Sequence, residues 1–163
     1  MNVHPFSDLE GLRVAAEMER RGGHFYARTA RILRDPEVVS LLTRLAEEEA
    51  SHLAEFQKLY QDALGAGDDP LYDDETNAYL SAVAAEVVFP DGLTELVCDP
   101  TPEGVLRAAI RAEEDSIAFY EKMLENTRSK SARQSFSAIA DTEREHRSGL
   151  KAMLDQRIQE VQG

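Results

Sequence analysis

The sequence predicts an all-α fold, a four-helix bundle with a long connector between its second and third helices. Four long amphipathic stretches are separated by Gly, Pro and Asp, and the composition is rich in helix formers and lacks tryptophan. A length of 163 residues with 42% hydrophobic residues fits a globular chain of one domain. We expect a single domain over residues 1–163, with halves at about 8–64 and 101–161 around a connector at 65–100.

The first helix is expected over residues 7–34. Ser7 followed three residues later by Glu10 is a capping-box pattern at its start. Apolar residues recur along the stretch at helical spacing. The pair Gly22-Gly23 weakens a helix locally, and we interpret it as close packing against a neighbouring helix.

The second helix is expected to follow after a short turn, over residues 36–64. Asp35-Pro36 supplies a capping side chain and then a proline in the first turn. Thr101-Pro102 repeats that pattern at the start of a third helix, which should end near Asn126. We also expect a short helix at about 74–88 in the connector and a fourth long helix at about 131–161.

The connector decides the topology of the bundle. Short links within each helix pair make the pair antiparallel, whereas a long link between the pairs lets the second and third helices run parallel. Residues 65–100 are long enough for that crossing.

The charge balance excludes several classes of partner. Lys and Arg number 18 and Asp and Glu 31, which gives a net charge of −13. This charge argues against nucleic acid or an anionic membrane as a partner. Cys98 is the single cysteine, so neither a disulfide within the chain nor a CxxC site is available. The first residues lack the features of a secretory signal, and no apolar run is long enough for a membrane span, so we expect a cytoplasmic protein.

The first half contains residue types that bind metals, at helical spacing. Glu19 precedes Tyr26 by seven residues, which places both along one stripe of a helix. Glu49 and His52, in the second helix, are three residues apart and face the same side, so both can reach one ion.

The second half repeats this pattern 94 residues later. Glu113 precedes Tyr120 by seven residues, and Glu143 precedes His146 by three. Two helices with one Glu each and two with Glu-x-x-His form the ligand set of carboxylate-bridged dinuclear metal sites. The predicted metal ligands are Glu19, Glu49, His52, Glu113, Glu143 and His146.

The predicted ligands balance the charge of two divalent cations. Four carboxylates carry four negative charges and the imidazoles are neutral, so the filled site is neutral inside the bundle. Without metal the carboxylates should repel one another and have raised pKa values. Oxygen and imidazole ligands suit two iron ions, with manganese or zinc as substitutes. The alternative for Glu49 and Glu143 is ordinary surface pairing, which would make the repeated histidines a coincidence.

Three further residues are predicted to support the ligands. Tyr26 and Tyr120 are either core aromatics or hydrogen-bond donors to ligand carboxylates across the bundle, and the two roles are compatible. Glu48, just before the ligand of the second helix, is placed to orient His146 on the facing helix. Its counterpart in the other half is Thr142, which offers only a neutral partner.

These motifs resemble the rubrerythrin-like branch of the ferritin-like superfamily. The matching pieces are Glu-x5-Phe-Tyr and Leu-Ala-Glu-Glu-Glu-x-x-His in the first half, and Glu-x5-Phe-Tyr and Ile-Ala-Asp-Thr-Glu-x-x-His in the second. The resemblance covers about residues 8–155 and implies a ferritin-like bundle with a di-iron centre bridged by Glu49 and Glu143. A bacterioferritin-like protein has the same six ligands, but the near-symmetric halves favour the rubrerythrin branch.

The sequence departs from full rubrerythrins in two ways. It has no cysteine pairs for a rubredoxin-like domain, so turnover would need an external electron donor, either rubredoxin-like or a flavin reductase. The family's additional carboxylate near the site has no counterpart in Ile110 or Ser116, three residues either side of Glu113.

The resemblance implies an oxidoreductase that reacts with hydrogen peroxide or dioxygen, as a rubrerythrin-like peroxidase in defence against oxidative stress. One alternative is a ferroxidase that serves iron storage or iron buffering. Another is a non-catalytic binding protein whose metal only braces the bundle. A homodimer is expected in each case, because ferritin-like bundles commonly pair through exposed helix faces.

Overall fold

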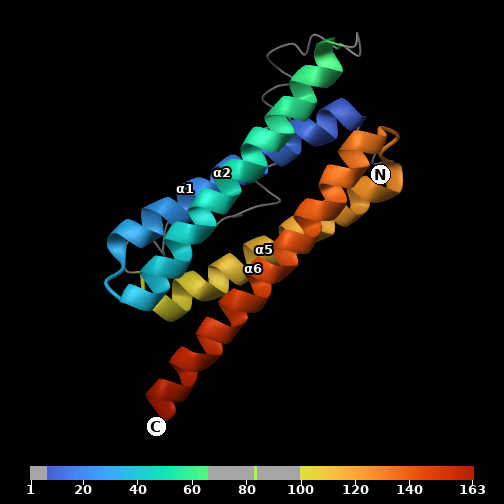
Figure 1. The fold of residues 1–163 in the computed structure, drawn as a ribbon. Coiled ribbons are helices and arrows are strands. Elements are labelled where there is room, and N and C mark those ends of the chain that lie inside the picture. The colour runs from blue at the N-terminus through green and yellow to red at the C-terminus, as the bar shows by residue number, and fades with distance from the viewer. Residues whose placement is uncertain (1–6, 66–82, 84–99) are drawn as a thin grey trace.

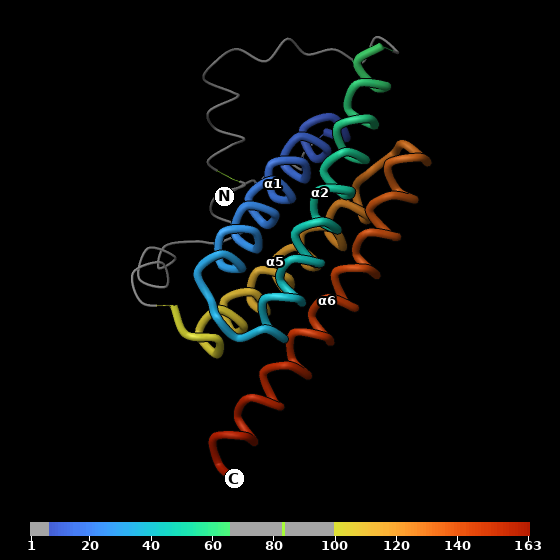
Figure 2. The backbone as a smooth tube through the Cα atoms, turned by 60° about the vertical axis from the view of Figure 1, so that its left-hand side comes forward, coloured from blue at the N-terminus to red at the C-terminus, as the bar shows by residue number. Residues whose placement is uncertain are grey.

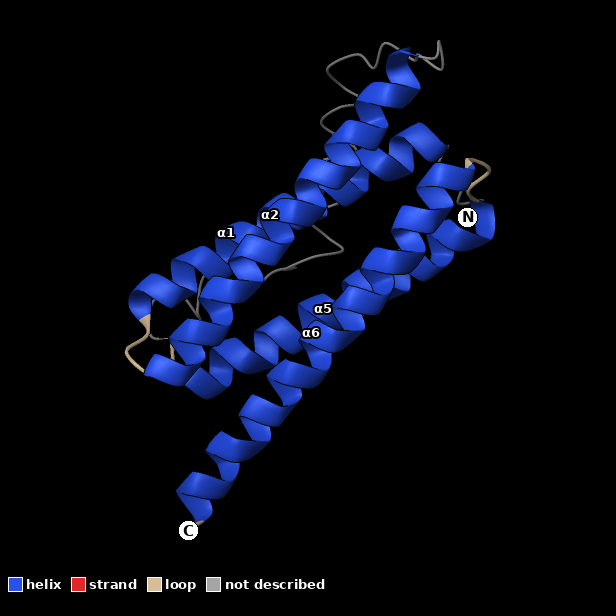
Figure 3. Ribbon diagram, viewed as in Figure 1, coloured by secondary structure: helices blue, strands red, loops and turns tan. Residues whose placement is uncertain are grey.

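The described residues of the computed structural model, 7–65, 83 and 100–163, form four helices and no strand (Figure 3). The helices are α1 (Asp8–Ile32), α2 (Pro36–Gly65), α5 (Pro102–Asn126) and α6 (Lys130–Gln162). The all-α prediction is confirmed, and these bounds agree with the expected ones within two residues. The short helix expected at 74–88 lies, apart from Val83, outside the described residues, as does Cys98.

The predicted capping residues begin the helices. Ser7 and Glu10 make both hydrogen bonds of a capping box at the start of α1. The side chains of Asp35 and Thr101 accept hydrogen bonds from backbone N–H groups in the first turns of α2 and α5. Ser129 does the same for α6, which therefore begins one residue earlier than expected.

Two helix hairpins make up the bundle (Figure 1). Helix α1 packs along α2, and α5 packs along α6; across the bundle, α1 faces α5 and α2 faces α6. The colour gradient in Figures 1 and 2 shows that α2 and α5 run in the same direction, the parallel arrangement that the long connector predicts. The four helices thus enclose one shared interior.

The interior is mostly apolar, and its buried glutamates and histidines gather in one polar layer. Aromatic rings pack beside that layer, with Phe56 5.6 Å from Tyr120 and 5.4 Å from Phe136 between ring centroids. Met18 and Met123 are buried in this interior. No helix in the described ranges is long and apolar enough to cross a membrane.

Helix α6 extends past the ends of the other helices (Figure 2). Near its end, Arg157 is buried and fastens α6 to the turn between α1 and α2. Its guanidinium lies 2.8 Å from an Asp35 carboxylate oxygen and 2.9 Å from a Glu37 carboxylate oxygen. This contact joins the C-terminal part of α6 to the first hairpin.

Candidate metal centre

The polar layer consists of four glutamates and two histidines, one or two from each helix. They form two overlapping clusters, and in each cluster one ligand-type atom per residue lies within 4.8 Å of the others. Every one of these side chains is buried, with exposed fractions between 1% and 8%. The residues that meet are Glu19, Glu49, His52, Glu113, Glu143 and His146.

The first cluster surrounds the Nδ1 atom of His52. This nitrogen lies 3.0 Å from Glu143 Oε1 and 3.4 Å from Glu19 Oε2. Glu49 Oε1 lies 3.9 Å from it. The ligand-type atoms thus come from α1, α2 and α6.

The second cluster surrounds the Nδ1 atom of His146. Glu49 Oε1 and Glu143 Oε2 each lie 3.3 Å from this nitrogen, and Glu113 Oε1 lies 3.6 Å from it. Glu49 and Glu143 therefore belong to both clusters, and Glu143 turns a different oxygen to each histidine. If each cluster held one ion, these two shared carboxylates would contact both.

The donor atoms in this layer fit a pair of metal ions. Oxygen and nitrogen ligands about 2.1 Å from one ion lie about 3 Å apart when adjacent, close to the separations found here. Buried polar atoms normally have hydrogen-bond partners. In the described part of the chain the inward-facing atoms lack them: Glu19 Oε2, Glu49 Oε1, both Glu143 oxygens and Nδ1 of His52 and His146.

Two tyrosines reach across the bundle to the ligand-type carboxylates. The Tyr26 hydroxyl, on α1, donates to Glu113 Oε1 on α5, and the Tyr120 hydroxyl, on α5, donates to Glu19 Oε1 on α1. Burial, followed by the nearby carboxylate charges, raises the pKa of both hydroxyls well above the usual value. Both tyrosines therefore keep their protons and act as donors.

The outer nitrogens of the two histidines have different surroundings. Nε2 of His146 is hydrogen-bonded to the Glu48 carboxylate, the contact expected from the sequence. The Thr142 hydroxyl donates instead to the backbone oxygen of Ala138, at 3.2 Å. Within the described residues no side chain is hydrogen-bonded to His52 Nε2. The expected role of Thr142 as its neutral partner is not seen, because its hydroxyl is engaged within α6.

The glycine pair in α1 makes room for Glu49. A Cβ atom at Gly22 would lie 2.9 Å from Glu49 Oε2, and one at Gly23 would lie 3.6 Å from Glu49 Cβ. The close packing interpreted from the sequence is therefore present, and at Gly22 it is contact with a candidate metal ligand. Helix α1 continues through both glycines.

Burial and the neighbouring charges shift the pKa values of several residues in the layer. Burial, and then the charges of Glu19 and other carboxylates, raises the pKa of Glu49 and Glu143 well above the ordinary value. Burial alone would lower the pKa of His146, but contacts with the surrounding carboxylates outweigh it and raise that pKa. The net direction for His52 is also upward, for the same reason.

The pKa of Glu19 is lowered, although the carboxylates of this layer were expected to have raised pKa values. Burial acts to raise its pKa, but contacts with His52, Glu49 and Tyr120 together lower it. The expectation is wrong for Glu19, because the contacts with donors around this carboxylate outweigh the effect of burial on its pKa. The Tyr120 hydroxyl is one of those donors.

A small hollow between α1 and α5 adjoins the second cluster. It has a volume of about 10 Å³, the space of one water molecule, and its lining includes Glu49, Glu113, Gly22 and Ser116. Ser116, which stands three residues after Glu113 and is not a carboxylate, thus borders the hollow with a small side chain. No pattern in the sequence indicated this hollow.

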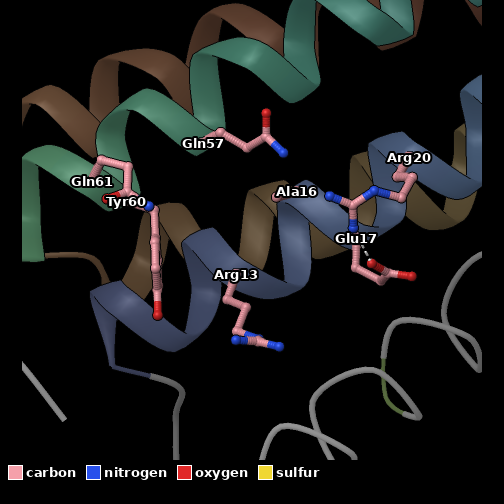
Figure 4. A pocket seen from close by; sticks show the side chains of 7 residues that line it. All are labelled: Arg13, Ala16, Glu17, Arg20, Gln57, Tyr60 and Gln61. Carbon is pink, nitrogen blue, oxygen red and sulfur yellow. Dashed lines mark hydrogen bonds and ion pairs between the residues drawn. The ribbon is translucent and has the colours of Figure 1, made fainter. Parts of the chain in front are cut away.

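A larger pocket of about 240 Å³ lies on the outer seam of α1 and α2, away from the polar layer (Figure 4). Figure 4 shows Arg13 and Arg20 on α1 and Tyr60 on α2 along its walls. None of the six clustered residues lines it. This pocket is therefore separate from the candidate metal centre.

Comparison with known proteins agrees with this architecture. The chain matches the family model for rubrerythrin over residues 10–154. A solved structure of a hypothetical protein from Pyrococcus furiosus is 24% identical, with a TM-score of 0.66 over 94% of this chain and 92% of that one, which shows the shared fold. No curated protein matches. Because the family model spans most of the sequence and the buried cluster fits a di-iron protein, the chain belongs to the rubrerythrin family.

Proposed function

We propose that this chain is a di-iron protein that reduces hydrogen peroxide or dioxygen, a rubrerythrin-like peroxidase that serves in defence against oxidative stress. One observation carries the proposal. The two histidine-centred clusters share Glu49 and Glu143, and the atoms facing inward lack hydrogen-bond partners within the described residues. A purely structural polar layer would satisfy those atoms, because each unpaired buried group costs about 1–3 kcal/mol.

The chain's residues divide the binding between two ion positions. Glu19 and His52 would hold one ion, Glu113 and His146 the other, and Glu49 and Glu143 would contact both. A pair of iron(II) ions, when bound, would supply two electrons, which with two protons convert one hydrogen peroxide into two water molecules. The bundle fixes the ligand directions and keeps the layer away from bulk water, since every ligand is buried.

The tyrosines hold in place the two carboxylates that belong to one cluster each, Glu19 and Glu113. Both hydroxyls keep their protons. The Tyr26 hydroxyl donates a hydrogen bond to one oxygen of Glu113, and the Tyr120 hydroxyl donates one to an oxygen of Glu19. The other oxygen of Glu19 has no hydrogen-bond partner in the described part of the chain and points toward the cluster. The hydrogen bonds thus select the carboxylate orientation that metal binding needs.

The hollow between α1 and α5 adjoins the shared carboxylate Glu49. Its space of about one water molecule leaves no room for an organic substrate of ordinary size. Ser116 and Gly22 on its walls leave this side of the layer less crowded than larger side chains would.

Sustained turnover also requires a source of electrons. The sequence contains one cysteine, so it does not itself provide a four-cysteine iron site. We therefore include an external donor, a rubredoxin-like protein or a flavin reductase, in the proposal.

The test is stopped-flow absorbance on anaerobic protein loaded with two Fe(II) per chain, mixed with hydrogen peroxide or with air-saturated buffer. Faster oxidation by peroxide, ending in a stable ferric spectrum, supports a peroxidase. Faster oxidation by dioxygen, with turnover of more than two ions per chain, contradicts the peroxidase and supports a ferroxidase. No rapid step with either oxidant contradicts both and leaves a metal that braces the bundle.

A double variant supplies the control for that experiment. Glu19→Ala with Glu113→Ala removes one ligand from each ion position, so it should lose rapid oxidation and bind iron more weakly. Glu47→Ala with Glu114→Ala removes the same charge from exposed positions and should behave like the unaltered protein. If both double variants oxidise iron at the unaltered rate, the proposed centre is wrong.

A further inference from the structure

The two halves of the polar layer differ at the outer nitrogens of their histidines. Nδ1 of each histidine faces a pair of shared carboxylates and one carboxylate of its own. On the opposite side of the ring, Nε2 of His146 is hydrogen-bonded to Glu48. The equivalent position in the repeat is Thr142, whose hydroxyl is occupied by Ala138 O. Among the described residues, His52 Nε2 therefore has no such partner.

In other respects the two clusters match closely. Each has one carboxylate of its own, Glu19 or Glu113, and each of these accepts a hydrogen bond from a tyrosine of the facing helix. The histidine rings are nearly parallel, at 21°, with centroids 5.9 Å apart. The contact with Glu48 is thus the main chemical difference between the two candidate ion positions.

A carboxylate on the outer nitrogen prepares a histidine for metal binding. It holds the ring proton on that nitrogen, so the inner nitrogen presents its lone pair to the ion, and it also fixes the orientation of the ring. Loss of such a partner typically weakens metal binding by about 10- to 100-fold. Because the Glu48 side chain is 41% exposed and lies 3.9 Å from Arg44 Nε, we expect the lower end of that range.

We propose that the two ion positions are unequal, that the position at His146 binds a divalent cation first and about tenfold more tightly, and that Glu48 is the positioning residue responsible. This inference rests on the proposed metal centre. It predicts that a protein given less than one ion per chain concentrates the ion at His146 and leaves the position at His52 largely free. The His52 position would then be the one that exchanges its ion.

The test titrates the full chain with Co(II) under anaerobic conditions by calorimetry, and measures anomalous diffraction at the cobalt edge from crystals at half saturation. The unaltered protein should bind in two steps, with the anomalous peak stronger at His146. Glu48→Ala should weaken the first step about tenfold and even out the two peaks. Thr142→Glu should strengthen the second step.

Glu47→Ala is the matched control, because it removes the same charge from an exposed neighbour on α2. It should leave both steps and the peak ratio unchanged. Equal peaks at half saturation in the unaltered protein, or equal weakening of both positions by Glu48→Ala, would overturn the inference and leave the metal centre intact. Absence of Co(II) at both positions would contradict the metal centre itself.

Discussion

The hydroxyl of Tyr26 on α1 donates a hydrogen bond to the Glu113 carboxylate on α5. The same contact runs in the opposite direction, from Tyr120 on α5 to Glu19 on α1. Each hairpin therefore orients a candidate ligand of the other. The metal centre and the packing of α1 against α5 depend on the same pair of hydrogen bonds, so a change in one should be measurable in the other.

Removal of either tyrosine hydroxyl should weaken both stability and metal binding. Tyr26→Phe or Tyr120→Phe deletes a buried hydrogen bond to a carboxylate, which we expect to cost about 1.5–3 kcal/mol in the free energy of unfolding. The released carboxylate can rotate away, so affinity at its own ion position should fall about tenfold. Chemical denaturation and Co(II) titration measure the two effects.

Tyr60→Phe is the control for these variants, since Tyr60 is half-buried in the outer pocket and makes no side-chain hydrogen bond within the described residues. It should change neither stability nor Co(II) affinity appreciably. An unchanged Co(II) affinity in both Tyr26→Phe and Tyr120→Phe would show that the hydroxyls do not position the ligands.

Gly22→Ala should damage the metal centre. The new Cβ would lie 2.9 Å from Glu49 Oε2, closer than packed atoms allow, so the end of this side chain, which belongs to both clusters, must move. Overpacking costs about 1–3 kcal/mol, partly offset by about 1 kcal/mol from the better helix propensity of alanine. We expect modest destabilisation and at least about a tenfold loss of Co(II) affinity, measured by calorimetry.

Gly149→Ala makes the same chemical change in α6, where the added Cβ has no atom within 4 Å. This variant should be more stable by about 0.5–1 kcal/mol and bind Co(II) normally. If Gly22→Ala binds Co(II) as tightly as Gly149→Ala does, close approach at Gly22 is not needed for the site.

The metal-free protein should lose stability as the pH rises from about 5 to 8. The pKa of Glu49 and Glu143 is raised above 4.5, and that of His52 and His146 above 6.5. The folded state therefore keeps protons that the unfolded state releases, and the free energy of unfolding falls with pH. Glu19, with a lowered pKa, acts in the opposite direction but is outnumbered. Thermal melts in a chelating buffer measure this slope.

Because the metal-free layer keeps protons on its carboxylates and histidines, metal binding should release protons. The ions must displace protons from the carboxylates and histidines, so affinity should rise with pH over the range in which metal-free stability falls. Calorimetry in buffers of different ionisation enthalpy counts the released protons. A Co(II) affinity independent of pH, with no proton release, would contradict the assigned protonation of the layer.

Replacement of a shared carboxylate should separate stability from function. Glu143→Gln resembles the protonated acid, so it removes the cost of keeping that group neutral at pH 8. We expect a higher melting temperature of the metal-free protein at pH 8, little change at pH 5, and loss of the large stabilisation by added metal. A lower melting temperature at pH 8 would show that the Glu143 charge stabilises the metal-free bundle.

Much of this architecture was predictable from the sequence because it depends on helical spacing. Glu49 and His52, three residues apart, must share a helix face, and capping residues such as Ser7 and Thr101 mark the helix starts. The internal repeat then predicted which residues from different helices would meet. The role of Glu48 beside His146 was expected from bundles of this kind, in which the residue before the ligand Glu can orient a histidine of the facing helix.

Features that depend on side-chain rotamers were not predictable in this way. The sequence does not show that the Thr142 hydroxyl turns to its own helix, as it does toward Ala138 O. Nor does it show that donors around Glu19 outweigh burial and lower its pKa. The hollow beside Ser116 depends on the distance between α1 and α5, which no local pattern specifies.

The most direct test of the central claim is the number of Fe(II) ions bound per chain in an anaerobic titration. The account predicts two for the unaltered protein and none held tightly by Glu49→Ala with Glu143→Ala, since both shared carboxylates are lost. Glu47→Ala with Glu145→Ala, at exposed positions on the same two helices, should still bind two. Failure of the unaltered protein to bind iron, or two ions bound by the double variant at Glu49 and Glu143, would contradict it.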